Sequence, residues 1–190
     1  MNASPPVEIP PSMAEKFADA DWGANHLEQI TIFKKFSRQE LKDIYQRGTI
    51  QALKAGTHAV IEGEPSRGVY IILHGSVSVY KNDSVTGAMH RLAYLEEGAT
   101  FGEISLFDNA PRSATVAADT HCYVFCLDAE TFEEYLTSAG DDARIRFYKT
   151  CAEEMSERFR SINSDYIISQ QLLWKYALRR TDEDQDPVAG

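Results

Sequence analysis

The sequence predicts an α+β protein that is mainly β, in which antiparallel strands form a sandwich or a barrel between helical segments. From Ile50 onward, short apolar runs such as VYIIL, SVSVY and HRLAYL alternate with glycines. Runs of this length between turn residues are typical of strands. Helix signals occur before Ile50 and after Asp128 but not between the runs, which favours antiparallel sheets over alternating strands and helices.

The first 48 residues are predicted to form a leader followed by helices. Residues 1–11 contain Pro5, Pro6, Pro10 and Pro11. Proline fixes backbone angles and removes hydrogen-bond donors, so this leader is expected to be flexible and extended. In residues 12–48, Ser12 is suited to cap a helix that begins near Met13, and Gly23 is expected to break it.

A short helix through about Arg47 has the clearest local signal in this region. Ser37 and Glu40 stand at the two positions of a capping box, in which each side chain binds the backbone N–H of the other residue. Phe36 and Leu41 stand at the two positions of a hydrophobic staple. The sequence therefore predicts that this helix begins directly after Ser37.

Residues 49–128 are predicted to form the β domain. In SVSVY, Val77 and Val79 alternate with more polar neighbours, which is the period of two expected for a strand with one buried face. The segments SATVAA and HCYVFCL predict further strands.

Residues 129–180 are predicted to be helical, and residues 181–190 form an acidic tail that is expected to fray. Asp128 can cap AETFEEYL, and a long helix is expected from about Asp142 to Arg180. This helix fits packing on the chain's own β domain, a dimer seam or a lid over a ligand, and the sequence leaves these interpretations open. Its apolar stripe has spacings of four and three, at Tyr148, Ala152, Met155, Phe159, Ile162 and Tyr166, and resumes at Leu173 and Tyr176.

The overall composition bears on the class of protein. The chain has 190 residues, 43% of them hydrophobic, which suits one folded domain with helical extensions. Its formal net charge of −10 opposes binding to nucleic acids or anionic membranes. It has no long apolar run and no signal-peptide pattern, so we expect a cytoplasmic protein without a membrane partner. Cys122, Cys126 and Cys151 lack the spacing of a metal site, so no metal is predicted.

One stretch, FGEISLFDNAPRSATV at residues 101–116, has the groups needed to bind a small anion. Gly102 leaves the backbone bare beside the Glu103 carboxylate, and EISLF predicts a helical turn whose first N–H groups face an anion. Arg112 is the only cation of the stretch and can form a bidentate pair with a phosphate, while Ser113 adds a hydroxyl and an N–H. A carboxylate beside a phosphate site also suits a sugar hydroxyl. The combination predicts a ribose phosphate as the ligand.

This stretch is similar to the phosphate-binding cassette of the cyclic nucleotide-binding domain family, the family of the catabolite activator protein and of the regulatory subunits of cyclic-AMP-dependent kinase. EGEPSRGVYIILHGSVSVY resembles the early strands of that family, with Gly63, Glu64 and Gly75 at its turn positions. LAYLEEGATFGE resembles the entry into the cassette, and the resemblance covers about residues 33–165. It implies an eight-stranded antiparallel jelly-roll barrel with flanking helices.

The resemblance also implies roles for individual residues of the cassette. Glu103 is expected to accept a hydrogen bond from the ribose 2′-hydroxyl, and Arg112 is expected to neutralise the cyclic phosphate. Leu106 is expected to be the apolar contact that moves when the ligand binds. The phosphate cradle is completed by Gly102, Ile104, Ser105 and Ser113.

Outside the cassette, Val60, Leu92 and Leu95 fall where relatives line the pocket. Asn163 falls where relatives place a hydroxyl residue that meets the base, and its amide can bond to a purine edge. A hydroxyl directly after the arginine, here Ser113, is linked in parts of the family to cyclic GMP, although relatives with Ser or Thr there also bind cyclic AMP. Cyclic AMP is the predicted ligand and cyclic GMP is the alternative.

The predicted function is that of a cyclic nucleotide sensor or regulatory protein, in which binding moves the cassette and the helices after Asp128 close over the base. The altered helical surface then acts on a homodimer or on another protein. The sequence has no catalytic pair, metal cluster or Walker-type loop, so an enzyme is not predicted. It leaves no room for a helix-turn-helix domain after the long helix, so DNA is not expected as a partner. Two alternatives stay open: a scaffold whose fold no longer responds to nucleotide, and a regulatory fragment of a longer enzyme.

Overall fold

The computed structural model of the chain describes residues 9–106 and 110–183, with side chains through Tyr176. The predicted leader and acidic tail fall largely on residues 1–8 and 184–190, which lie outside the described residues. The chain divides into two compact units, Met1–Phe147 and Tyr148–Gly190.

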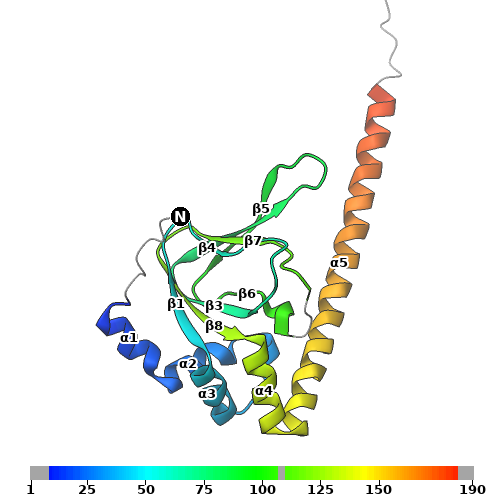
Figure 1. Ribbon diagram of the computed structural model, residues 1–190. Coiled ribbons are helices and arrows are strands. Elements are labelled where there is room, and N and C mark those ends of the chain that lie inside the picture. The colour runs from blue at the N-terminus through cyan, green and yellow to red at the C-terminus, as the bar shows by residue number, and fades with distance from the viewer. Residues whose placement is uncertain (1–8, 107–109, 184–190) are drawn as a thin grey trace, which may run out of the picture. The chain divides into compact units, whose positions relative to one another are not determined.

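The first unit is built on two four-stranded antiparallel sheets (Figure 1). One sheet has the strand order β1-β8-β3-β6, and the other has the order β2-β7-β4-β5. The strands are β1 Thr49–Leu53, β2 His58–Val60, β3 Gly68–His74, β4 Ser76–Asn82, β5 Met89–Glu96, β6 Thr100–Phe101, β7 Thr115–Ala118 and β8 Cys122–Asp128.

These sheets confirm the predicted α+β class with antiparallel strands, but the predicted closure into one barrel is not found. Within residues 9–106 and 110–183, no ladder of backbone hydrogen bonds joins one sheet to the other. Two of the edge strands, β2 and β6, have only three and two residues, so they offer few backbone groups for such a ladder. The two sheets pack face to face instead.

The space between the sheets holds a cluster of buried side chains. Alternate residues of a strand face the same side, so Tyr70 and Ile72 of β3 point into this space together with Val124 and Cys126 of β8. Strands of the opposite sheet close the cluster from the other side. Its buried members are Val60, Tyr70, Ile72, Val77, Phe101, Val116, Ala118, Cys122, Val124 and Cys126.

The strand predicted at SVSVY is confirmed as part of β4, but its polar face is not open to water. Ser76 and Ser78 are both buried. The Ser78 hydroxyl donates a hydrogen bond to the Asp119 carboxylate at 2.8 Å, and the Ser76 N–H donates to the Thr120 hydroxyl at 3.0 Å. The turn before β8 therefore covers this end of β4.

Helices precede the first strand and follow the last strand of the sheets along the chain. Those before β1 are α1 Pro11–Ala18, α2 Ala20–Glu28, the 3₁₀ helix η1 Thr31–Phe33 and α3 Arg38–Arg47. Those after β8 are α4 Ala129–Ala139 and α5 Asp141–Glu183, whose first residues belong to the first unit. The helical segments predicted before and after the β domain are thereby confirmed.

The helix break expected at Gly23 is wrong, because Gly23 lies inside α2. The break falls at Asp19, whose side chain caps α2 by accepting a hydrogen bond from the Asp21 N–H. A Cβ atom on Gly23 would lie 2.2 Å from the ring of Tyr45, so the glycine allows α2 to approach α3 closely. The first helix begins with Pro11 and has no side-chain cap from Ser12.

Helices cover the outer face of the first sheet. Tyr45 of α3 stacks on Phe125 of β8, with ring centroids 4.9 Å apart. Phe132 of α4 contacts Phe33 and Phe147, with centroids 5.6 and 4.8 Å away. Both faces of β3 are therefore buried, which explains why its sequence is a continuous apolar run rather than an alternating one.

The capping box predicted for α3 is confirmed, and its glutamate has a second role. The Ser37 N–H donates to the Glu40 carboxylate at 2.6 Å, and the Glu40 N–H donates to the Ser37 hydroxyl. Arg146, in the first turns of α5, forms an ion pair with the same carboxylate and donates to the Lys35 carbonyl at 2.8 Å. Partial burial alone raises the pKa of Glu40, but the hydrogen bonds from Arg146 and Ser37 outweigh it and lower this pKa to about 2.

The stability of the protein should therefore depend on the charge of Glu40. A carboxyl with a lowered pKa stabilises the fold above its ordinary value of 4.5, and this contribution is lost as the pH falls toward about 2. Glu40→Gln keeps a capping box but removes the charge, so we expect it to lower the unfolding free energy by about 1–3 kcal/mol at pH 7. Urea unfolding from pH 7 to pH 2.5 should show the difference shrinking. If the unfolding free energies of Glu40→Gln and the wild type depended on pH in the same way, this prediction would be contradicted. Glu130→Gln in α4 is the control substitution of a glutamate near a helix start.

The second unit consists of the remainder of α5, which confirms the predicted long helix. Its apolar side chains are largely exposed, and those above half exposure are Phe159, Ile162, Tyr166, Ile167, Ile168, Leu172, Leu173, Trp174 and Tyr176. None of the described helices is both long and apolar enough to cross a membrane.

Candidate functional site

Arg112 is the centre of the candidate site. It is only 7% exposed, although it is charged. One guanidinium nitrogen, Nη2, donates a hydrogen bond to the Gly68 carbonyl at the start of β3, at 2.9 Å. The guanidinium lies 5.5 Å from the ring of Tyr70, which stacks on Phe101 with centroids 5.0 Å apart. The arginine is thus held between β3 and the entry to the cassette.

Gly102 provides the space for this arrangement. Its φ of +76° is a backbone conformation that favours glycine, and it turns the chain directly after β6. A Cβ atom at this position would lie 2.3 Å from Nη1 of Arg112 and 2.9 Å from the Gly68 carbonyl oxygen. The bare backbone predicted from the sequence is therefore the surface against which the guanidinium lies.

The helical turn predicted in EISLF is present as the 3₁₀ helix η2, Glu103–Leu106. Glu103 is partly buried, Ile104 is 37% exposed and Leu106 is 7% exposed. The turn packs against both β3 and α4. Ser105 contributes its backbone to η2, and its side chain lies outside the described part of the chain, as do residues 107–109.

The segment that leads from the cassette into β7 is fixed by contacts that the sequence analysis missed. The Arg112 N–H donates to the Glu64 carbonyl at 2.8 Å, and the Arg112 carbonyl accepts from the Gly63 N–H at 2.9 Å. The Lys81 ammonium group donates to the Ser113 carbonyl at 2.6 Å and to the Glu62 carboxylate at 2.6 Å. The only sequence signal for these contacts was the pair of turn residues at Gly63 and Glu64.

Buried groups beside the arginine remain uncharged near neutral pH. Burial raises the pKa of the Tyr70 phenol to about 12, and burial also raises the pKa of the Cys126 thiol. The partly exposed Glu62 carboxyl behaves differently, because the hydrogen bond from Lys81 lowers its pKa. The positive charge of Arg112 therefore faces neutral aromatic and thiol groups on its inner side, which suits binding of an anion.

Of the residues predicted to line a pocket, some are found in the interior between the sheets and others are exposed. Val60 belongs to the cluster between the sheets, and Leu95 packs against that cluster. Leu92 is 62% exposed on β5 and is not among the residues of this cluster. Asn163 is an exposed residue of the second unit. The structure thus brings Gly102, Glu103 and Arg112 together, while ligand contacts by the other residues stay predictions.

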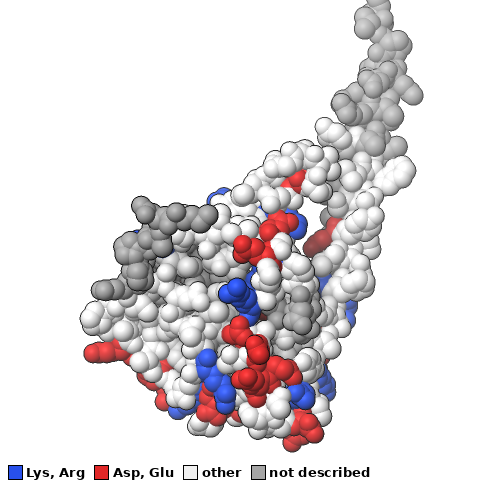
Figure 2. All heavy atoms as spheres, viewed as in Figure 1, with Lys and Arg blue, Asp and Glu red and all other residues white. Residues whose placement is uncertain are grey.

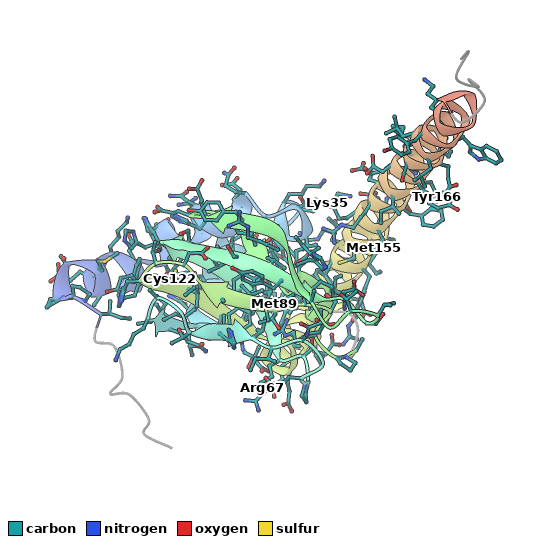
Figure 3. The ribbon with its side chains drawn as sticks, turned by 90° about the horizontal axis from the view of Figure 1, so that it is seen from above. Lys35, Arg67, Met89, Cys122, Met155 and Tyr166 are labelled. Carbon is teal, nitrogen blue, oxygen red and sulfur yellow. The ribbon has the colours of Figure 1, made fainter. Side chains whose placement is uncertain are left out.

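The surface of the first unit lacks a large patch of one charge on the face shown in Figure 2, where acidic and basic side chains are interspersed. Arg67, which directly precedes Gly68, is exposed and points away from the sheets (Figure 3). Arg112 differs from it in being buried against the backbone. The geometry therefore suits one small anion held locally rather than an extended polyanion.

Known proteins are similar to this chain in sequence over its β domain. The family model described as cyclic nucleotide-binding domain matches residues 50–139. The chain is 28% identical over 124 residues to the cAMP-dependent protein kinase regulatory subunit of Candida albicans, which covers 65% of this chain and 26% of that protein. It is 30% identical over 169 residues to the corresponding subunit of Neurospora crassa, covering 81% of this chain and 40% of that protein. The chain thus spans well under half the length of these relatives.

A solved structure shares the fold. The N-terminal domain of a transcriptional regulator from Streptomyces coelicolor A3(2) superposes with a TM-score of 0.65 at 21% sequence identity. The match covers 70% of this chain and 94% of that one. Nearly the whole of a separately solved domain is therefore represented in this chain.

Proposed function

From the membership of residues 50–139 in the cyclic nucleotide-binding domain family, we propose that the protein is a sensor that binds a cyclic nucleotide through its cassette and signals through its C-terminal helices. The observation that carries the proposal is the buried Arg112, seated on the bare backbone of Gly102 beside Glu103. A buried guanidinium at a helical turn suits a phosphate that carries one charge. Glu103 is then the acceptor for the ribose 2′-hydroxyl.

Cyclic AMP is the proposed ligand, and cyclic GMP is the alternative. The two relatives described above are regulatory subunits of cAMP-dependent protein kinase, which favours cyclic AMP. Ser113 is exposed directly after Arg112, and its hydroxyl can accept or donate a hydrogen bond at the ligand. Contacts of Val60, Leu92, Leu95 and Asn163 with the nucleotide belong to this proposal.

The proposed signal runs from the cassette to the helices after the sheet. Because η2 packs on α4 as well as on β3, and Leu106 is buried there, a ligand that repositions η2 changes the surface on which α4 rests. Binding shifts the population of helix arrangements only if one arrangement binds the nucleotide better. The output is a change in a homodimer formed through α5 or in a complex with another protein.

The second candidate is a scaffold that binds a partner through α5 without responding to nucleotide. The observation that favours it is the exposed apolar surface of the second unit, which a monomer in water leaves uncovered. This candidate predicts that partner binding is unchanged by cyclic nucleotides.

Titration calorimetry of the purified chain, after removal of any bound nucleotide, tests the proposed function. Cyclic AMP and cyclic GMP are titrated in parallel, and a micromolar or lower dissociation constant is expected for cyclic AMP. 5′-AMP is the control, because it carries the same base with an open phosphate. If the folded, nucleotide-free protein bound neither cyclic nucleotide, the sensor would be excluded and the scaffold favoured.

The proposed role of Glu103 gives a separate prediction. Glu103→Gln should weaken cyclic AMP binding by roughly tenfold, because a charged acceptor becomes a neutral one. The same substitution should have little effect on 2′-deoxy cyclic AMP, which lacks the hydroxyl. Equal losses for both ligands would show that Glu103 acts on the structure of the cassette and not on the ribose.

A further inference from the structure

We propose that Lys81 and Glu62 are positioning residues of the anion site. Lys81 holds the carbonyl group of Ser113, and Glu62 holds Lys81. Neither residue is assigned a contact with the nucleotide. The pair fixes the chain directly after Arg112, so that Ser113 is presented to the ligand in one orientation. This inference rests on the proposed function and adds two residues to its site.

The segment that leads from the cassette into β7 lies before the ladder of strand pairs begins. β7 pairs with β4 in the second sheet (Figure 1), and the pair nearest this segment is Thr115 opposite Tyr80. Arg112 and Ser113 precede that pair in the chain. The turn after β2 holds the backbone of Arg112 through hydrogen bonds to backbone groups. The contact at Ser113 is of another kind.

This contact at Ser113 comes from a side chain of β4. Lys81 directly follows Tyr80, and its ammonium group donates a hydrogen bond to the Ser113 carbonyl oxygen at 2.6 Å. Because the peptide group is planar, holding this carbonyl fixes the peptide plane that Ser113 forms with Ala114. Ser113 therefore has fewer orientations open to it before a ligand arrives, which lowers the ordering cost of binding.

Glu62 holds the lysine in place. One carboxylate oxygen accepts from the Lys81 ammonium group at 2.6 Å, and the other accepts from the Asn82 N–H at 3.0 Å. The N–H of Glu62 donates to the hydroxyl of Thr115, a buried residue, at 3.0 Å. The hydrogen bonds from Lys81 and Asn82 lower the pKa of the carboxyl, so it stays charged at neutral pH. A fixed anion restricts a long side chain that has many rotamers of its own.

The pair is suited to positioning rather than to attracting the phosphate by charge. The positive charge of Lys81 is matched by the carboxylate of Glu62, so together they add no net charge near the ligand. The two roles predict opposite effects of removing Glu62. If Lys81 attracted the phosphate, loss of the nearby negative charge would strengthen binding. If Lys81 acts by position, the same loss weakens binding, because the lysine is no longer held against Ser113.

Calorimetric titration with cyclic AMP measures which role is correct. Lys81→Met should weaken binding by roughly fivefold, because a hydrogen bond from a charged donor is lost. Glu62→Met should weaken it by roughly threefold, because the lysine loses its partner. The double variant should bind no more weakly than Lys81→Met, because the two residues act as a unit.

Lys42→Met is the matched control. Lys42 also forms an ion pair, with Asp21 at 2.7 Å, but this pair joins α3 to α2. Its loss removes the same charge from the chain and should change the affinity by less than about twofold. Thermal unfolding of each variant shows whether it is folded.

A double-mutant cycle tests whether Lys81 acts through Ser113. Ser113→Ala removes the hydroxyl in the wild type and in Lys81→Met. The hydroxyl should contribute less to cyclic AMP affinity in Lys81→Met, because Ser113 is no longer held in one orientation. A general weakening of the fold would leave the two effects additive. An equal contribution of the hydroxyl in both backgrounds would therefore overturn the inference.

The remaining outcomes separate this inference from the proposed function. Unchanged cyclic AMP binding in Lys81→Met would overturn the inference while leaving the proposed function in place. Stronger binding in Glu62→Met would also overturn it, because Lys81 would then act by charge. A wild type that binds neither cyclic nucleotide would overturn both. If Lys81→Met did not fold, Glu62→Met would decide, because only the positioning role predicts its weaker binding.

Discussion

Arg112→Ala should weaken cyclic AMP binding by roughly 10- to 100-fold, since one charge-assisted hydrogen bond contributes about 1.5–3 kcal/mol. The arginine is the cation that the cassette holds in a buried position, and the net charge of the chain opposes anion binding elsewhere. Calorimetric titration of wild type and variant measures the difference. Because Arg112 also donates to the Gly68 carbonyl, thermal unfolding must first show that the variant is folded.

Two further variants make this result specific. Arg112→Lys keeps the positive charge but loses the planar fork and its contact with Tyr70, so we expect it to bind more weakly than the wild type and more tightly than Arg112→Ala. Arg67→Ala removes an exposed positive charge near the same strand and should change affinity by less than about threefold. If Arg112→Ala bound cyclic AMP as tightly as the wild type, the cassette could not be the nucleotide site.

Gly102→Ala should be the second most damaging substitution at the site. It adds a Cβ atom in a backbone conformation that costs about 1–3 kcal/mol for residues other than glycine. It also pushes that atom to 2.9 Å from the Gly68 carbonyl oxygen and displaces the guanidinium of Arg112. We expect an affinity loss of at least about tenfold, together with a lower midpoint of thermal unfolding.

Gly87→Ala is the matched control for this prediction. Gly87 has a similar φ of +71°, but nothing lies within 4 Å of the position that its Cβ would occupy. It therefore shares the backbone strain of Gly102→Ala without the collision. Equal binding losses in the two variants would show that the close approach to Arg112 does not matter, whereas a loss confined to Gly102→Ala would establish it.

Several elements were predictable from the sequence because their signals are local. The capping box of α3 lies within four consecutive residues, Ser37 to Glu40, and both of its hydrogen bonds are present. The turn after Gly102 and the short helix η2 likewise follow from a glycine and the run after it. Gly23 failed as a helix breaker because its role depends on Tyr45, which is remote in sequence.

The contacts that complete the site were not predictable in this way. Arg112 meets Gly68 and Tyr70, and the Ser113 carbonyl meets Lys81, across separations of more than 30 residues. Leu92 was assigned to the pocket by its place in the sequence, and that sequence could not show that its side chain is 62% exposed on β5. The pairing of strands decides such placements, and a shift of one residue reverses which face a side chain occupies.

By itself, the sequence determined the order of helices and strands, the caps and turns, and the chemical groups of the cassette, because each depends on residues near one another in the chain. Only the tertiary structure decided that the strands form two sheets rather than a closed ring, that β3 is buried on both faces, and that Arg112 lies buried over Gly102. The physical reason is that these features arise from packing between segments far apart in sequence, where burial and hydrogen bonding favour one arrangement over others of similar local propensity.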